Sequence, residues 1–154
     1  MELVWKKASA ADLELLTESR VETLRAANGL SADADMEAVR AASRRYYAQA
    51  LACGTHAAYL VFDGEKLVGT GGVSFFEVMP TVCSPSGKKA YIMNMYTHPL
   101  YRRRGIAKKT LDLLIAESRA HGADSVSLEA TAMGRPLYES YGFTAMEHEM
   151  EYVL

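Results

Sequence analysis

The chain has 154 residues, of which 49% are hydrophobic and 23% charged, and this composition fits one soluble globular domain spanning residues 1–154. The formal net charge of -2 lacks the basic excess that is typical of nucleic-acid and membrane binders. Cys53 and Cys83 form no CxxC pair, so we expect neither a metal site nor a disulfide framework. The chain shows neither an apolar signal segment nor a run of roughly 20 apolar residues, so we expect a cytoplasmic protein.

The first part of the chain predicts a short strand over residues 3–7 and then two helices. Ser9 and Asp12 resemble a capping box at the start of the first helix, and an apolar stripe continues until Asn28-Gly29. The second helix is expected from about Asp35 to Gly54. Its inward-facing residues are predicted to be Met36, Val39, Tyr46 and Ala50.

After Gly54 the apolar pattern changes to that of strands. Residues 56–62 and 66–79 predict two strands, joined by a hairpin turn at Asp63-Gly64. A loop over residues 80–89 separates them from a strand over residues 90–97. The remaining elements are predicted as a helix over 106–121, a strand over 125–130, a helix over 136–141 and a strand over 143–153. This order predicts a mixed α/β domain with an antiparallel first half.

The segment from Thr97 to Lys109 contains the strongest chemical signal. Five of the eight residues from Arg102 to Lys109 are cationic, at the predicted start of a helix. Cations there face the positive end of the helix dipole and cost about 0.3–1 kcal/mol each, with no acidic residue nearby to offset them. Gly105 lets the backbone approach closely, so free N–H groups can bind phosphate oxygens. The pattern therefore favours a pyrophosphate site; the alternative is a solvated cluster of surface charges.

Two motifs make the pattern specific. Arg102-x-x-Gly105-x-Ala107 after a strand resembles the Q/R-x-x-G-x-G/A signature of the GCN5-related N-acetyltransferase (GNAT) family. Residues 137–143, Leu-Tyr-Glu-Ser-Tyr-Gly-Phe, resemble that family's LYxxxGF segment, and the two motifs lie about 30 residues apart, as in the family. The resemblance implies the GNAT (acyl-CoA N-acyltransferase) fold, a mixed and mostly antiparallel sheet with helices on both faces. It also implies transfer of an acetyl group from acetyl-CoA to a primary amine by direct attack on the thioester.

The resemblance also implies which residues bind the cofactor. The strand edge at residues 95–97 would bond the pantetheine arm, and the amides of residues 103–108 would hold the pyrophosphate. Thr131 stands where many members carry a cofactor-contacting asparagine, and Gly134 where they carry alanine. The cofactor-binding residues expected in this chain are Met95, Tyr96, Thr97, Arg102, Arg103, Arg104, Gly105, Ile106, Ala107, Lys108 and Thr131.

For the chemistry, the resemblance makes Tyr138 the general acid that protonates the departing thiolate, because a phenol stays neutral at pH 7 yet donates a proton readily. A backbone N–H on the 95–97 edge would polarise the thioester carbonyl. The base is left open. Many members carry a glutamate in the strand before the signature, but Asn94 here cannot accept a proton. Glu77, Glu129, His56 and a chain of water molecules are the alternatives.

The acceptor pocket is expected around residues 22–36 and 79–89. The acceptor itself stays open: a small-molecule amine, a peptide N-terminus or a lysine side chain. The apolar end of the strand over 144–153 suggests a homodimer contact. The alternative function is a non-catalytic sensor module that binds acyl-CoA, which would not need Tyr138. A nucleic-acid binder using Arg102 to Arg104 is disfavoured by the net acidity.

Overall fold

The computed structural model describes residues 2–154 and contains a five-stranded sheet and four α-helices. The strands are β1 (Leu3–Lys7), β2 (His56–Asp63), β3 (Lys66–Glu77), β4 (Lys88–Thr97) and β5 (Ser125–Leu128). The helices are α1 (Leu13–Ala27), α2 (Glu37–Cys53), α3 (Ile106–Ala120) and α4 (Arg135–Tyr141), with 3-10 turns η1 (Ala10–Asp12) and η2 (Pro99–Tyr101).

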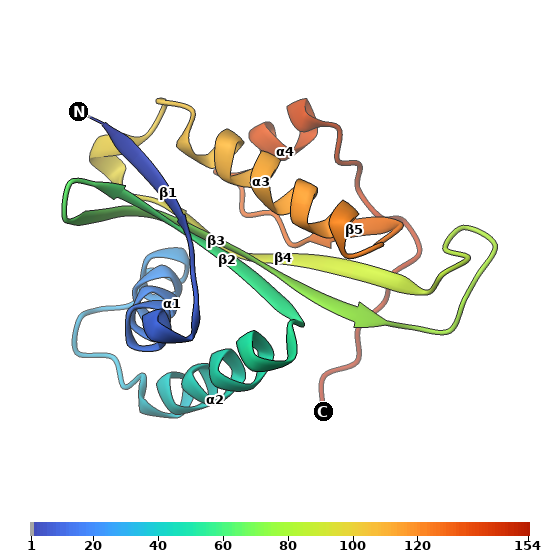
Figure 1. The fold of residues 1–154 in the computed structure, drawn as a ribbon, viewed down its shortest axis with the longest axis horizontal. Coiled ribbons are helices and arrows are strands. Elements are labelled where there is room, and N and C mark those ends of the chain that lie inside the picture. Colours follow the sequence, from blue (N-terminus) through green and yellow to red (C-terminus); the bar gives the residue numbers. More distant parts are fainter. Residues whose placement is uncertain (1) are drawn as a thin grey trace.

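The strands lie in the order β1-β2-β3-β4-β5, so sequence neighbours are also neighbours in the sheet. The first three pairings are antiparallel, and β5 pairs parallel to β4 after the α3 crossover. Helices α1 and α2 cover one face of the sheet, while α3 and α4 cover the other (Figure 1). The apolar core is accordingly split: Leu111 and Leu114 of α3 are buried on one face, and Leu16 and Tyr47 on the other. The predicted mixed, mostly antiparallel sheet with helices on both faces is confirmed.

The local signals at the start of α1 and at the β2–β3 turn act as the sequence predicts. The backbone N–H of Ser9 donates to Asp12 Oδ2 at 2.9 Å, which completes the capping box, although the chain passes through η1 before α1 begins. Asp63 pairs with Lys66 across the turn, and Gly64 has a φ of +60°, a conformation that glycine adopts without strain. The predicted hairpin is confirmed.

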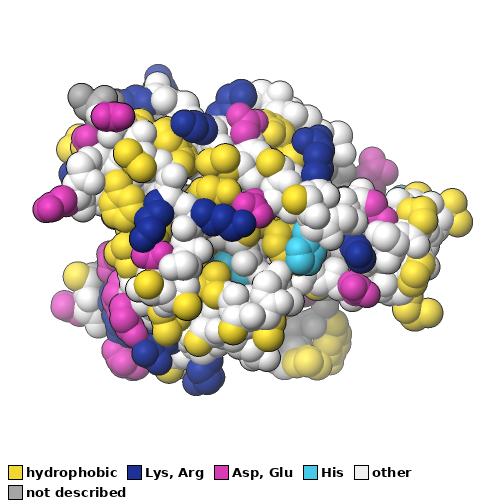
Figure 2. All heavy atoms as spheres, in the orientation of Figure 1, with side chains coloured by type: hydrophobic (Ala, Val, Ile, Leu, Met, Phe, Trp, Pro, Cys, Tyr) yellow, Lys and Arg dark blue, Asp and Glu magenta, His cyan; other side chains and the backbone are white. Residues whose placement is uncertain are grey.

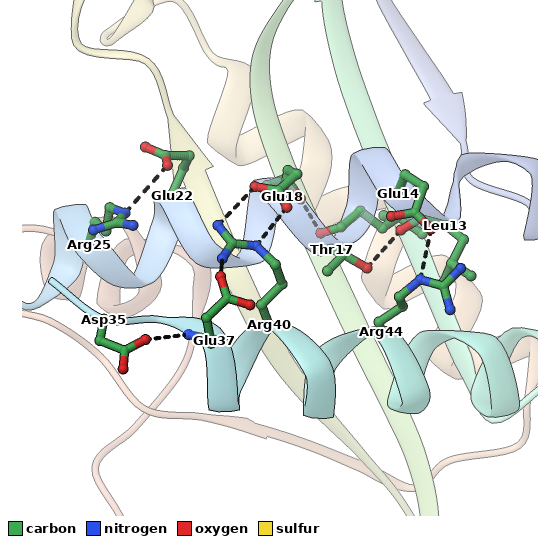
Figure 3. Close-up of polar contacts among 12 residues, drawn as sticks. Leu13, Glu14, Thr17, Glu18, Glu22, Arg25, Asp35, Glu37, Arg40 and Arg44 are labelled. Atoms are coloured by element: carbon green, nitrogen blue, oxygen red, sulfur yellow. Dashed lines mark hydrogen bonds and ion pairs between the residues drawn. The ribbon is translucent and has the colours of Figure 1, made fainter. Parts of the chain in front are cut away.

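Salt bridges between α1 and α2 align the two helices. Arg40 binds Glu18 at 2.8 Å and Arg44 binds Glu14 at 2.7 Å, each across the helix pair (Figure 3). Exposed pairs of this kind are worth about 0–1 kcal/mol each, so they set alignment more than stability. The prediction that Tyr46 faces inward is wrong by one position. Tyr47 is the buried residue, with 3% of its surface exposed against 42% for Tyr46, and it continues the inward face formed by Met36, Ser43 and Ala50.

The predicted last strand over residues 143–153 is also wrong. Within the described residues, the chain after Tyr141 contains neither helix nor strand. Met146, Met150, Tyr152 and Val153 are all exposed in this segment, so no buried face fixes a register for it. The edge strand β5, which precedes this segment in the chain, has four half-buried residues and offers only a short template.

An irregularity in β4 lies next to the strand edge at residues 95–97 that is expected to bond the pantetheine arm. The β3–β4 register shifts between Thr70 and Gly72, and Asn94 opposite the shift has a φ of +60°. β5 pairs only with residues 89–92 of β4. Beyond Ile92 the outer edge of β4 has no strand beside it in the described chain, so a neighbouring strand does not take up its backbone groups there.

Candidate active site

Two cavities flank this open end of β4. The large cavity has a volume of about 960 Å³ and lies between the end of β4, the start of α3 and helix α4. The small cavity has a volume of about 420 Å³ and lies between α1, β4 and the end of β5. Five residues line both: Thr23, Ala27, Met95, Thr131 and Tyr138. The cavities therefore meet at a shared wall that contains Tyr138.

The start of α3 forms the anion-binding end of the large cavity. Arg103 and Gly105 both have left-handed backbones, with φ of +62° and +78°. The N–H of Lys109 is bonded to Gly105 O at 3.0 Å, so the amides of the three preceding residues are not used by the helix. Left-handed residues that precede a helix N-terminus create a concave set of N–H donors suited to phosphate oxygens.

The positive side chains around this turn divide into different roles. Lys108 binds Asp112 at 3.2 Å, so the expectation that no acid offsets these cations is wrong; Asp112 lies one helical turn further on. Lys109 Nζ lies 3.9 Å from the ring centroid of Trp5. The guanidinium of Arg104 lies 5.2 Å from the ring centroid of Tyr101. Lys108, Lys109 and Arg104 are thus held by their partners. The backbone N–H groups are therefore the main hydrogen-bond donors at the anion-binding start of α3.

The large cavity brings together nearly all the residues predicted to bind the cofactor. Arg104 is the exception, since it stands outside the lining. Arg102 donates from Nε to the carbonyl of Thr97 at 3.3 Å, which ties the turn to the end of β4. The members that line the cavity are Met95, Tyr96, Thr97, Arg102, Arg103, Gly105, Ile106, Ala107, Lys108 and Thr131.

Tyr138 lies where the two cavities join. Its side chain is only 9% exposed, and burial raises the pKa of its hydroxyl above the usual 10.0. The ring packs edge-on against Phe143 and over Gly134, where an added Cβ would lie 3.0 Å from Tyr138 Cε2. A side chain at position 134 would therefore crowd the Tyr138 ring. Thr131 Oγ1 accepts a hydrogen bond from Gly134 N at 3.1 Å, so its hydroxyl stabilises the start of α4.

The three side chains considered as bases occupy different environments. Glu129 follows β5 and lines the small cavity. His56 is buried under α2, where Nδ1 lies 2.9 Å from the Tyr46 hydroxyl, and it belongs to neither lining. Glu77 lies at the far end of β3, paired with Lys88. Glu129 is therefore the one of the three that lines a cavity.

The acceptor side of the site differs from the sequence expectation. Arg20 and Thr23 of α1 and Tyr91 of β4 line the small cavity, together with part of the predicted segment 22–36. Among the described residues, none of 79–89 lines either cavity. That loop projects from the end of the sheet (Figure 1), and the same end of the molecule carries hydrophobic side chains on its surface (Figure 2); Met79 and Val82 of the loop are exposed. The helical spacing of residues 20, 23, 24 and 27 was the available signal for this wall.

Stability should depend on pH through His56. Burial lowers the pKa of its imidazole from 6.5 to about 4, so the folded protein holds His56 neutral where the unfolded chain is protonated. We expect the free energy of unfolding to fall by about 3 kcal/mol as the pH drops from 6.5 to 4. Urea unfolding of His56→Gln should lose most of this dependence, whereas His148→Gln in the exposed C-terminal segment should keep it. Parallel pH profiles for wild type and His56→Gln would contradict the assignment.

The comparison with known proteins defines the class. Residues 22–143 match the model of the acetyltransferase (GNAT) family, and the chain belongs to this family. An uncharacterized N-acetyltransferase, YsnE of Bacillus subtilis (strain 168), is 29% identical over 96 residues. That match covers 59% of this chain and 58% of the relative, so it spans little more than half of each protein.

Two solved structures are similar along nearly the whole chain. A predicted acetyltransferase from Clostridium acetobutylicum, solved with acetyl-CoA, has a TM-score of 0.90 and 29% identity over 99% of this chain and 96% of its own. A GCN5-related N-acetyltransferase from Ralstonia eutropha JMP134 has a TM-score of 0.85 and 27% identity, covering 99% of both chains. These likenesses confirm the predicted GNAT fold.

Within residues 2–154, no helix is both long and apolar enough to cross a bilayer. Nor does any group of three or more histidine, cysteine, aspartate or glutamate side chains within this range lie close enough to hold a metal ion.

Proposed function

We propose that this protein is an N-acetyltransferase that moves the acetyl group of acetyl-CoA to a primary amine. The observation that carries the proposal is the position of Tyr138, whose ring lines both cavities at their junction. The large cavity would hold acetyl-CoA and the small cavity the amine. Support for the first assignment comes from the Clostridium acetobutylicum relative, which was solved with acetyl-CoA. Free exposed thiols at Cys53 and Cys83 favour a reducing, cytoplasmic location.

In the large cavity the protein would bind the two ends of the cofactor differently. The N–H groups at the start of α3 would donate hydrogen bonds to the pyrophosphate, and Arg102 and Arg103 would add positive charge beside it. The unpaired edge of β4 at residues 95–97 would bond the amides of the pantetheine arm, much as another strand would. The thioester would then point to the shared wall.

The reaction needs one bond made and one broken. The amine nitrogen attacks the thioester carbonyl carbon, the C–N bond forms, and the C–S bond breaks with its electron pair on sulfur. Tyr138 would donate its hydroxyl proton to that sulfur, and its raised pKa keeps it protonated at neutral pH. Glu129, directly or through water, would take a proton from the amine nitrogen as that nitrogen adds to the carbonyl carbon. A backbone N–H of the β4 edge would stabilise the developing oxyanion.

Two measurements test the proposal. Acetyl-CoA should raise the melting temperature, because a ligand that binds only the folded state stabilises it by mass action. Release of free thiol from acetyl-CoA should then depend on the added amine, across a panel that includes small amines, peptides and lysine. Saturating acetyl-CoA with neither a shift nor calorimetric heat would reject the proposal. Binding without turnover on any amine would favour the second candidate, an acyl-CoA sensor that shares the same large cavity.

A homodimer remains a prediction. The segment after Tyr141 exposes Met150, Tyr152 and Val153. Strand β5 is the last strand of the sheet, so its outer edge has no neighbouring strand within the described chain. A second copy would cover this apolar segment and extend the sheet. Light scattering at micromolar concentration should give twice the chain mass of 16.9 kDa. Truncation after Thr144 should reduce it to the monomer mass; a monomeric full-length chain would remove the prediction.

A further inference from the structure

Arg20 is unusual among the arginines of the first two helices. It is half-buried, lines the small cavity, and makes no hydrogen bond or ion pair within the described chain. Its neighbours Arg25, Arg40 and Arg44 each bind a glutamate (Figure 3). A guanidinium that is partly removed from water without a counter-ion is unfavourable. An anion that entered the cavity would relieve this cost and find a donor suited to bidentate binding.

The opposite wall of the small cavity carries hydrogen-bond acceptors. Asn94 is 9% exposed, and its Oδ1 is buried with no partner in the described part of the chain. Its left-handed backbone, with a φ of +60°, holds the residue at the β4 irregularity beside Met95. Glu129 adds a carboxylate to the same lining from the end of β5. An unpaired buried acceptor and a carboxylate together favour an amine or ammonium.

We infer that the acceptor is a small amine that also carries an acidic group, a carboxylate or a phosphate, and that Arg20 binds this group. The amine would lie at the acceptors of Asn94 and Glu129, close to Tyr138. This inference rests on the proposed function and specifies the substrate of the same site. A cavity of about 420 Å³ suits a small molecule. Arg20 would repel an acceptor that is cationic along its whole length.

The test compares matched amines on the whole protein. One arm uses ω-amino acids from glycine to 6-aminohexanoate against their carboxamides. The other uses phosphoethanolamine against ethanolamine, which separates phosphate from carboxylate as the recognised group. Binding of each to the CoA-loaded protein is measured by calorimetry, and turnover by thiol release. The variants are Arg20→Met and, as a matched control, Arg45→Met, an exposed α2 arginine outside both cavities.

Wild type should prefer one acidic amine over its neutral partner by at least tenfold in affinity and kcat/KM. Arg20→Met should lower the value for that acid by about 10- to 100-fold, the range for losing a charged hydrogen bond, and leave the neutral partner within about twofold. Arg45→Met should behave as wild type. The inference is overturned if no acidic amine binds the CoA-loaded protein, or if the neutral partners match the acidic amines in affinity and kcat/KM. It is also overturned if Arg20→Met retains the preference for the acidic amine. Absence of acetyl-CoA binding would instead reject the proposed function itself.

Discussion

Tyr138→Phe is expected to lower turnover by about 10²–10⁴ while the affinity for acetyl-CoA changes little, because losing a general acid typically has this effect. The substitution keeps the ring that packs against Phe143 and Gly134 and removes only the hydroxyl. The loss should therefore appear in kcat, measured as thiol release with a productive amine. Calorimetric binding of acetyl-CoA reports whether the large cavity is intact.

The pH profile gives a second readout for Tyr138. Burial raises the pKa of the hydroxyl, so wild-type turnover should fall only above the usual tyrosine value of 10.0, where the acid is lost. In Tyr138→Phe this high-pH limb should move or flatten, while the low-pH limb, set by the amine and its base, should remain. Tyr141→Phe is the control, since the Tyr141 hydroxyl binds Asp112 outside both cavities. Wild-type turnover in Tyr138→Phe would exclude the acid role.

Gly105→Glu is expected to weaken acetyl-CoA binding by on the order of 100-fold or more. A Cβ at Gly105 meets no heavy atom within 4 Å, so the new side chain has room in the free protein. Its carboxylate, however, would lie in the anion site, where a like charge at about 4 Å costs about 4 kcal/mol near a protein surface. The expected result is loss of the melting-temperature shift that acetyl-CoA produces in wild type.

The backbone at Gly105 needs its own control, because a φ of +78° strains any residue with a Cβ. Gly64→Glu supplies it. Gly64 has a φ of +60°, open space around the same position, and a place in the β2–β3 turn outside both cavities. Both variants should therefore lose similar stability, and Gly64→Glu should keep the shift with acetyl-CoA. An equal shift in both variants would show that the start of α3 does not bind the pyrophosphate.

Local signals in the sequence predicted most of the fold. The Ser9–Asp12 capping box, the Asp63-Gly64 turn and the change of apolar period after Gly54 each act within a few residues, and each appears in the structure. The last strand could not be judged in this way, because a strand needs a partner edge and a buried face. Residues 143–153 find neither within the described chain.

The site was predictable to a smaller extent. Most of the large cavity is built from the end of β4, the turn that follows it and the two motifs, so these residues could be listed from the chain order; the α1 residues Thr23, Ala26 and Ala27 could not. The small cavity combines α1 with the distant ends of β4 and β5, and no local pattern reports that meeting. Arg20 looks like any surface arginine until the ion pairs of its neighbours are seen. His56 was a reasonable base by residue type, but burial under Tyr46 and Tyr47 removes it from the cavities.

The wall shared by the two cavities also has a kinetic consequence. Thr23, Ala27, Met95, Thr131 and Tyr138 line both, so two substrates bound at once would lie next to each other where the cavities adjoin, and the amine could reach the thioester directly. No side chain would need to be acetylated as an intermediate carrier between acetyl-CoA and the amine. Initial rates measured against both substrates should then give intersecting double-reciprocal lines, the pattern of a ternary complex, instead of the parallel lines of a covalent acetyl-enzyme.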